Sequence, residues 1–237
     1  MQLLRAAILF LAGCLVAVPV IAQTGHLAFT RLGSEGPAPS PRLDAPIAYD
    51  APGRQLILVG GLDGSGNRND LWAYSLDRKQ WRELNPTGDR PAPRHGHSLV
   101  FEPVRRRVIL FGGQASRFFA DTWAYDIAGN AWRQLSAGGP PERYAHSAIY
   151  DPRGDRMVIS HGFVSEQGRF DDTWAFDLRA AAWRNITPGA PRPLRRCLHH
   201  AVYDERAHQM LLYGGCSSGF GPCPQGDLWS FDLLRSA

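Results

Sequence analysis

Residues 121–125 read Asp-Thr-Trp-Ala-Tyr, and a second tryptophan, Trp132, follows nine residues after Trp123. This pair recurs along the 237-residue chain, and all seven of its tryptophans fall on the same two positions: Trp72 and Trp81, Trp123 and Trp132, Trp174 and Trp183, and Trp229. Corresponding members are 51 residues apart until the last step, which is 55. A fixed period of this length predicts a repeat architecture.

The repeats are built from four segments, each with the pattern of a short β-strand, and the last copy has only the first three. An arginine precedes the first segment, which ends seven residues later at an aromatic residue, as from Arg94 to Phe101. The second is an apolar run that closes on a glycine pair, as in residues 108–113. The third carries Asp-x-Trp-x-aromatic, as in residues 121–125, and the fourth carries the second tryptophan, as in residues 80–84. The alternation of apolar and polar positions predicts an all-β chain.

The motif Pro93-Arg94-x-x-His97, the glycine pairs, the Asp-x-Trp-x-aromatic segment and the closing tryptophan together resemble the kelch repeat. The resemblance covers nearly all of residues 29–232. It implies a β-propeller of four-stranded blades, similar to that of galactose oxidase. We expect one propeller domain over residues 23–237, with four blade repeats at about residues 41–84, 93–135, 142–186 and 195–232.

The last repeat lacks a fourth strand, and the N-terminal segment offers a candidate for it. Phe29 lies 13 residues before Arg42, the interval that also separates Trp81 from Arg94. We therefore expect residues 27–32 to pair into the last blade, which would close a ring of four blades and cover the open edges of the sheet. Two alternatives remain open: the chain is a fragment of a larger ring, or two chains share one larger ring as a homodimer.

The first 22 residues have the pattern of an export signal. Arg5 precedes an apolar stretch over residues 6–18, and Val20-Ile21-Ala22 forms a cleavage site of the small-residue kind. We expect a secreted or periplasmic protein with no membrane span after cleavage. Residues 11–14, Leu-Ala-Gly-Cys, resemble a lipobox and would instead make a lipoprotein through Cys14. Lys79 is the only lysine among 26 basic residues, which indicates a GC-rich bacterial source.

Export to an oxidising compartment permits disulfide bonds. Cys216 and Cys223 bracket a loop rich in glycine, serine and proline, and a bond between them is the favoured pairing. Antiparallel pairing of the first two strands of the last blade also brings Cys197 within reach of Cys216, which leaves a second pairing open.

The overall charge is too weak and too evenly spread to indicate a nucleic acid partner. The chain has 26 basic and 22 acidic residues, and removal of Arg5 with the signal changes the formal net charge from +4 to +3. The sequence also contains no glycine-rich phosphate loop before a helix. We expect no cofactor and no nucleic acid partner.

On one face of the predicted propeller the connections vary in length. The second glycine and the following tryptophan are 11, 10, 12 and 14 residues apart in the four copies. Length variation is typical of recognition loops, and aromatic side chains beside planar polar groups suit a protein or carbohydrate ligand. The candidate ligand-binding residues are Arg68, Asn69, Gln114, Arg117, Phe118, Phe119, Glu166, Arg169, Phe170 and Phe220.

Three histidines, His97, His146 and His199, hold the same place at the start of the innermost strand, where the first copy has Ala45. Converging imidazoles could hold a metal ion. The kelch resemblance implies instead that they brace the blade, so we expect no metal site. We also expect the repeated arginines and the acids of the Asp-x-Trp segments to form internal ion pairs, because every copy has both.

The kelch resemblance implies a binding platform more readily than an enzyme. We therefore expect an exported, non-catalytic binding module with its ligand on the variable face. The alternative is a small carbohydrate-active enzyme, such as a sugar mutarotase or epimerase, in which Glu166 or His146 would supply the acid or base. The copper ligands of a galactose oxidase cannot be assigned in this chain, so we identify no catalytic residue.

Overall fold

The computed structural model describes residues 29–33, 36–217 and 223–234. The chain divides into two compact units, residues 1–32 and residues 33–237. The expected export signal lies outside the described residues, and so does Cys14. No helix in the described ranges is long and apolar enough to cross a membrane.

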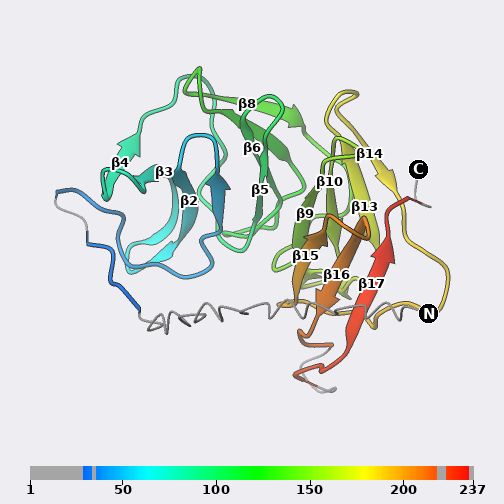
Figure 1. Cartoon of the computed structure of the whole chain (residues 1–237). Coiled ribbons are helices and arrows are strands. Elements are labelled where there is room, and N and C mark those ends of the chain that lie inside the picture. Colours follow the sequence, from blue (N-terminus) through cyan, green and yellow to red (C-terminus); the bar gives the residue numbers. More distant parts are fainter. Residues whose placement is uncertain (1–28, 34–35, 218–222, 235–237) are drawn as a thin grey trace, which may run out of the picture. The chain divides into compact units, whose positions relative to one another are not determined.

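Residues 33–237 form four antiparallel sheets that follow one another along the chain (Figure 1). We call them blades 1 to 4. The strands of blade 1 are β1 (Ile47–Asp50), β2 (Gln55–Asp63), β3 (Gly66–Ser75) and β4 (Gln80–Leu84). The strands of blade 2 are β5 (Ser98–Glu102), β6 (Arg107–Phe111), β7 (Thr122–Asp126) and β8 (Ala131–Ser136).

Blade 3 has the same order with a small hairpin inserted after its second strand. Its strands are β9 (Ser147–Asp151), β10 (Arg156–Ser160), β13 (Thr173–Asp177) and β14 (Ala182–Asn185). The inserted hairpin consists of β11 (Phe163–Val164) and β12 (Gly168–Arg169). Blade 4 consists of β15 (His200–Asp204), β16 (Gln209–Tyr213) and β17 (Leu228–Asp232). The prediction of an all-β propeller of kelch-type blades is confirmed.

The repeated sequence pattern predicted several of the strand bounds. The expected fourth strand, residues 80–84, has the bounds of β4. In blade 2 the glycine pair follows the last residue of β6, and Gly112 and Gly113 both adopt positive φ. In blade 1 β2 instead runs through Gly60 and Gly61 to Asp63, with a shift of register between Val59 and Gly61. A Cβ at Gly113 would lie 2.9 Å from the carbonyl oxygen of His95, so this position has no room for a side chain.

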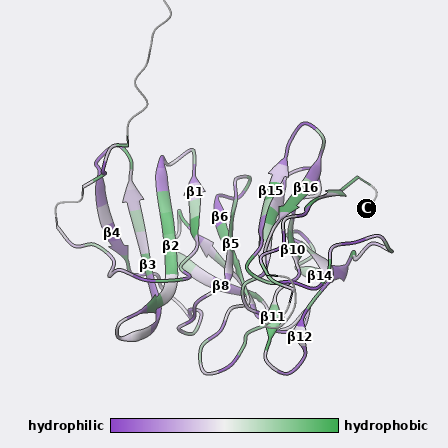
Figure 2. Ribbon diagram, turned by 90° about the horizontal axis from the view of Figure 1, so that it is seen from below, coloured by the Kyte–Doolittle hydropathy of each residue, from purple (hydrophilic) through white to green (hydrophobic). Residues whose placement is uncertain are grey.

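The hydrophobic cores lie between consecutive blades rather than within them. The first joins blades 1 and 2, the second joins blades 2 and 3, and the third joins blades 3 and 4. In these cores apolar residues of the second strand of one blade pack against the next blade. The fourth-strand tryptophans Trp132 and Trp183 pack in the core that their blade shares with the preceding one. Figure 2 shows hydrophobic colour along part of β2, the strand that contributes Ile57 and Val59 to the first core. Each blade is therefore stabilised mainly by its neighbours.

The expected closure of the ring by the N-terminal segment is not present in the described residues. Residues 29–32 carry no strand, Phe29 is fully exposed, and blade 4 is a sheet of three strands. Residues 27 and 28 lie outside the described part. The observed fourth strands follow a tight turn from the third strand and place a tryptophan on its aromatic residue, as Trp81 does on Tyr74. The N-terminal segment has neither the turn nor the tryptophan, and the matching interval alone did not supply this pairing.

Candidate functional site

A buried arginine occupies the same position in all four blades. In blade 2 the Arg94 guanidinium donates two hydrogen bonds to Asp121, at 2.5 and 2.9 Å, and one to the carbonyl of Gly112 at 3.0 Å. The Trp123 indole donates to the same carboxylate at 2.7 Å. The equivalent ion pairs are Arg42–Asp70, Arg143–Asp172 and Arg196–Asp227. The predicted internal ion pairs are confirmed, and they tie the first strand of each blade to its second and third.

These contacts keep the aspartates ionised. Burial by itself would raise the pKa of Asp121, but the hydrogen bonds and charge of Arg94 outweigh it and hold the pKa below its usual value. In blade 4 the hydrogen bond from Arg196 is the largest influence and lowers the pKa of Asp227 strongly. Because each carboxylate is occupied by an arginine and a tryptophan, none is free to act on a ligand.

The repeated histidines lie between the blades. His97, His146 and His199 are all buried. The Nε2 atom of His146 lies 2.7 Å from the Ser98 hydroxyl of blade 2, and its ring contacts Phe111 edge to face at 5.3 Å between centroids. Burial, followed by the nearby charge of Arg94, lowers the pKa of His97 to about 3. These imidazoles are therefore uncharged at neutral pH and serve as packing groups between blades.

The described residues contain no cluster of three or more histidine, cysteine, aspartate or glutamate side chains able to hold a metal ion. The two residues considered as an acid or base, Glu166 and His146, lie in different surroundings. Burial lowers the pKa of His146 well below its ordinary value. Glu166 lies exposed in the turn of the β11–β12 hairpin.

An open cavity of about 440 Å³ lies where the first strands of all four blades begin. Its lining residues are Asp44 to Pro46, Gly96 to Leu99, Ala145 to Ala148 and Leu198 to Ala201. Each blade thus contributes the same short segment. The cavity is the mouth of the channel around which the blades are arranged.

A chain of polar and aromatic side chains runs along the edge of this mouth. The Tyr144 hydroxyl donates to the exposed Asp44 carboxylate at 3.0 Å, and burial together with this bond raises the pKa of Tyr144 to about 12. The Tyr144 ring contacts His95 edge to face at 5.4 Å between centroids. His95 in turn lies 2.6 Å from the amide oxygen of Asn67. Blades 1, 2 and 3 all contribute to this chain.

The second element of the site is formed by the variable connections of blades 2 and 3. The Phe118 ring contacts the Phe163 ring at 6.1 Å, and the Arg169 guanidinium lies 5.5 Å from the centre of Phe163. Phe163 also forms two backbone hydrogen bonds with Tyr144, each of 2.9 Å. The aromatic pair therefore continues directly from the edge of the channel mouth. We call the combined surface the rim: Asp44, Asn67, His95, Phe118, Tyr144, Phe163 and Arg169.

Two predicted ligand-binding aromatics lie against the buried arginines, Phe119 buried and Phe170 half-buried. Phe119 is 6% exposed and lies beneath the Arg94 guanidinium at 3.8 Å. Phe170 lies in the same relation to Arg143 at 4.2 Å. Each ring covers the internal ion pair of its blade, and Phe119 is too buried to contact a ligand. This corrects the assignment of Phe119, which sequence alone could not separate from its neighbour Phe118.

The other predicted ligand-binding residues are spread over the same face. Arg68 lies 3.5 Å from Asp63 in the extended β2–β3 hairpin. The Asn69 side chain donates a hydrogen bond of 3.2 Å to the carbonyl of Pro91, in the connection between blades 1 and 2. Gln114 pairs through its backbone with His95, and Arg117 lies exposed with its guanidinium 5.1 Å from the Phe119 ring. Phe220 lies outside the described residues.

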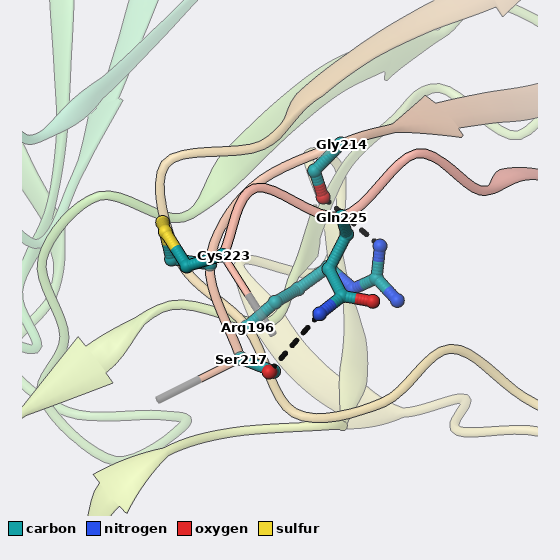
Figure 3. The surroundings of a disulfide bond; sticks show 6 residues. Arg196, Gly214, Ser217, Cys223 and Gln225 are labelled. Atoms are coloured by element: carbon teal, nitrogen blue, oxygen red, sulfur yellow. Dashed lines mark hydrogen bonds between the residues drawn. A yellow bond between two sulfur atoms is a disulfide. The ribbon is translucent and has the colours of Figure 1, made fainter. Parts of the chain in front are cut away.

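The corresponding connection of blade 4 is held by a disulfide bond between Cys216 and Cys223, as the loop spacing predicted (Figure 3). Cys197 is a free, buried cysteine that pairs through its backbone with Cys216. The Gln225 side chain donates to the Ser217 hydroxyl at 3.1 Å, and its backbone N–H donates to Gly215 at 2.7 Å. The described parts of this connection are thus fixed next to the Arg196 ion pair.

Sequence reasoning missed Asp44, Tyr144 and Phe163. A usable signal existed in the repeat itself. The residue directly after the buried arginine is Leu43, His95, Tyr144 or Cys197 in the four copies, whereas the arginine never changes.

Repeated blades, the Arg–Asp–Trp units and a channel mouth bordered by variable connections define a kelch-type β-propeller. The family model of the Attractin/LZTR1 β-propeller matches residues 56–236, and the chain belongs to this family.

Several animal proteins are similar to this chain over part of their length. It is 26% identical over 218 residues to Kelch domain-containing protein 10 of Xenopus tropicalis, which covers 86% of this chain and 50% of that protein. It is 29% identical over 189 residues to host cell factor homolog hcf-1 of Caenorhabditis elegans, covering 69% of this chain and 24% of that protein. The match to multiple epidermal growth factor-like domains protein 8 of Mus musculus is 29% over 177 residues, 70% of this chain and 6% of that protein. The chain spans half or less of the length of these relatives.

Proposed function

We propose that this chain is an exported binding module that recognises a protein ligand at the rim. The observation that carries the proposal is the contrast between an invariant scaffold and a rim whose side chains differ from blade to blade. The rim combines aromatic rings, a carboxylate and a guanidinium within one connected surface. Aromatic residues and arginine are the side chains most enriched at the energetic centre of protein interfaces.

The shape of the rim favours a protein segment over a small molecule. The channel mouth is open, and the polar side chains stand along its edge rather than around an enclosed pocket. Small-molecule sites are usually concave and bury most of the ligand. The similarity to a kelch domain-containing protein supports the same reading. A carbohydrate remains the second ligand class to test, because the aromatic rings could also stack on sugars.

Export of the protein is also part of the proposal. The Cys216–Cys223 disulfide is of the kind that persists in oxidising compartments, which supports a secreted or periplasmic location. Cell fractionation of the source organism, with an N-terminal sequence of the mature protein, tests this part. Recovery in the cytosol with residues 1–22 intact would contradict it.

Binding is tested with peptide and glycan arrays probed by the purified chain and by three variants. Phe118→Ala and Arg169→Gln remove side chains of the rim, whereas Val104→Ala alters an exposed residue in the turn between β5 and β6. We expect peptide signals that fall by about tenfold or more in both rim variants, as for interface anchors, and that Val104→Ala retains. Peptide signals that survive both rim variants would contradict the site, and signals confined to glycans would contradict the ligand class.

A further inference from the structure

Blade 4 exposes the face that every other blade buries against its successor. Val59 in β2 and Phe111 in β6 are 2% and 0% exposed, but Tyr213, at the same position of β16, is 56% exposed. Leu71 in β3 is 1% exposed, and its counterpart Leu228 in β17 is 68% exposed. The residues of blade 4 are as apolar as those that form the cores between the other blades.

Blade 1 exposes the complementary face. Ile47 and Tyr49 of β1 are both exposed. Their counterparts in blade 2, Leu99 and Phe101, pack against the core shared with blade 1. The counterparts in blades 3 and 4 likewise pack against the core shared with the preceding blade. Blade 1 therefore presents the side of an interface that normally receives the preceding blade.

Two backbone hydrogen bonds repeat at every blade junction. In one, a glycine of the pair donates to the carbonyl of the buried arginine in the following blade: Gly61 to Arg94, Gly113 to Arg143 and Gly162 to Arg196, at 2.8, 2.8 and 2.9 Å. In the other, a residue at the channel mouth donates to its counterpart in the preceding blade: Gly96 to Asp44, Ala145 to Gly96 and Leu198 to Ala145, at 2.9, 2.9 and 3.0 Å. The junctions are thus geometrically alike.

The next member of each series would join blade 4 to a blade 1. Blade 4 offers the N–H of Gly215 and the carbonyl of Leu198, and blade 1 offers the carbonyl of Arg42 and the N–H of Asp44. Within the described residues these four groups have no hydrogen-bond partner. The donors and acceptors match in number and in position.

The charges at the outer turn match as well. At two junctions a basic side chain in the first turn of one blade approaches an acid of the preceding blade: the guanidinium of Arg106 lies 2.8 Å from Asp50, and the imidazole of His208, at the same position, lies 3.8 Å from Asp151. The corresponding acid of blade 4 is Asp204, and the corresponding residue of blade 1 is Arg54. Arg54 is engaged only in an exposed pair with Asp77, which is a weak competitor.

We propose that a second copy of this chain covers these faces, with blade 4 of each copy packed on blade 1 of the other. The contact joins two different faces, and two copies related by a twofold axis cover both faces of each copy and close the ring. Two copies give eight blades, whereas three would give twelve, beyond the usual range of four to eight. Although the backbone N–H of Asp44 lies in both, the side chains that test this interface, Tyr213 and Leu228, are not part of the rim, so dimer formation and ligand binding are tested by separate variants.

The test is the molar mass of the purified full chain in light scattering at about 10 µM, a concentration at which specific interfaces of standard size are occupied. We expect twice the mass of one chain. Tyr213→Asp and Leu228→Asp place a charge in the proposed interface and should raise the dimer dissociation constant by about 100-fold or more. Val104→Asp alters an equally exposed apolar residue in a turn away from both faces and should leave the dimer intact.

Because Tyr213 and Leu228 are exposed in the single chain, neither aspartate variant should lower the melting temperature of the dilute, monomeric protein. Amide hydrogen exchange provides a second measurement. The N–H groups of Gly215 and Asp44 should be protected from exchange in the wild-type dimer and should exchange fast in the Tyr213→Asp variant. A monomeric wild-type chain would overturn the proposal. So would a dimer that both aspartate variants leave intact, or a melting temperature lowered in the dilute variants, which would mean that the chain covers this face itself.

Discussion

Arg94 and His95 are neighbours in the chain, yet they belong to different parts of the molecule. The Arg94 side chain is 1% exposed and repeats the contacts of Arg42, Arg143 and Arg196. His95 lies on the rim, and the residue in its place is different in every blade. The repeated arginine ties together the strands of each blade, whereas the varied position beside it places His95 and Tyr144 on the proposed rim and buries Cys197 in blade 4.

The largest effect is expected from breaking the repeated position. Asp121→Ala would leave the Arg94 guanidinium buried without its carboxylate, which should lower the free energy of unfolding by about 3–5 kcal/mol. Asp77→Ala removes the acid of the exposed Arg54 pair and serves as the matched control, with no measurable change expected. Urea unfolding followed by tryptophan fluorescence measures both. Equal, small effects in the two variants would contradict a structural role for the buried pair.

The second-largest loss of stability is expected in blade 4, where Cys197 occupies the varied position that follows the buried arginine. Reduction of the Cys216–Cys223 bond should lower the free energy of unfolding by about 2–3 kcal/mol, because the reduced loop gains freedom in the unfolded chain. The double variant Cys216→Ser, Cys223→Ser should be insensitive to reductant, while Cys197→Ala should respond as the wild type does. A Cys197→Ala variant that no longer responds would assign the bond to Cys197 instead.

The third effect is a dependence of stability on pH, which we expect from the buried histidines and not from the exposed ones. Burial lowers the pKa of His97 to about 3, below the value of about 6.5 in an unfolded chain. The unfolded state therefore binds more protons between these two values, so the stability contributed by neutral His97 is complete above pH 6.5 and is lost as the pH falls. Between pH 7 and 5 this loss amounts to about 2 kcal/mol per histidine.

His97→Ala tests this directly, because blade 1 already carries Ala45 at the same position. The variant should be less stable at pH 7 but should show a shallower decline of the unfolding free energy toward pH 5. His200→Ala, at an exposed position, should leave the slope unchanged. A wild-type slope in His97→Ala would show that His97 takes up no extra proton on unfolding.

The repeats made most of the scaffold predictable, since each constraint is local and occurs several times. The buried arginines, their aspartates and the strand bounds follow from residue spacing, and the Cys216–Cys223 bond follows from loop length. The rim was harder to predict from the sequence. The pairing of Tyr144 with Asp44 joins residues 100 positions apart, and its chemistry occurs only once. Phe118 and Phe119 are adjacent and identical, and only the packing of Arg94 decides which ring is buried.

The smallest effect on stability is expected at the varied position itself. Tyr144→Phe removes the hydroxyl that donates to Asp44 but keeps the ring against His95, so the unfolding free energy should fall by only about 1 kcal/mol. On the peptide array the same variant should lose more signal than Val104→Ala, because Asp44 is then no longer held in place at the channel mouth. If the hydroxyl is structural, stability should fall as in Asp121→Ala while binding per folded molecule stays constant. A small loss of stability with a large loss of binding is the result that assigns Tyr144 to recognition.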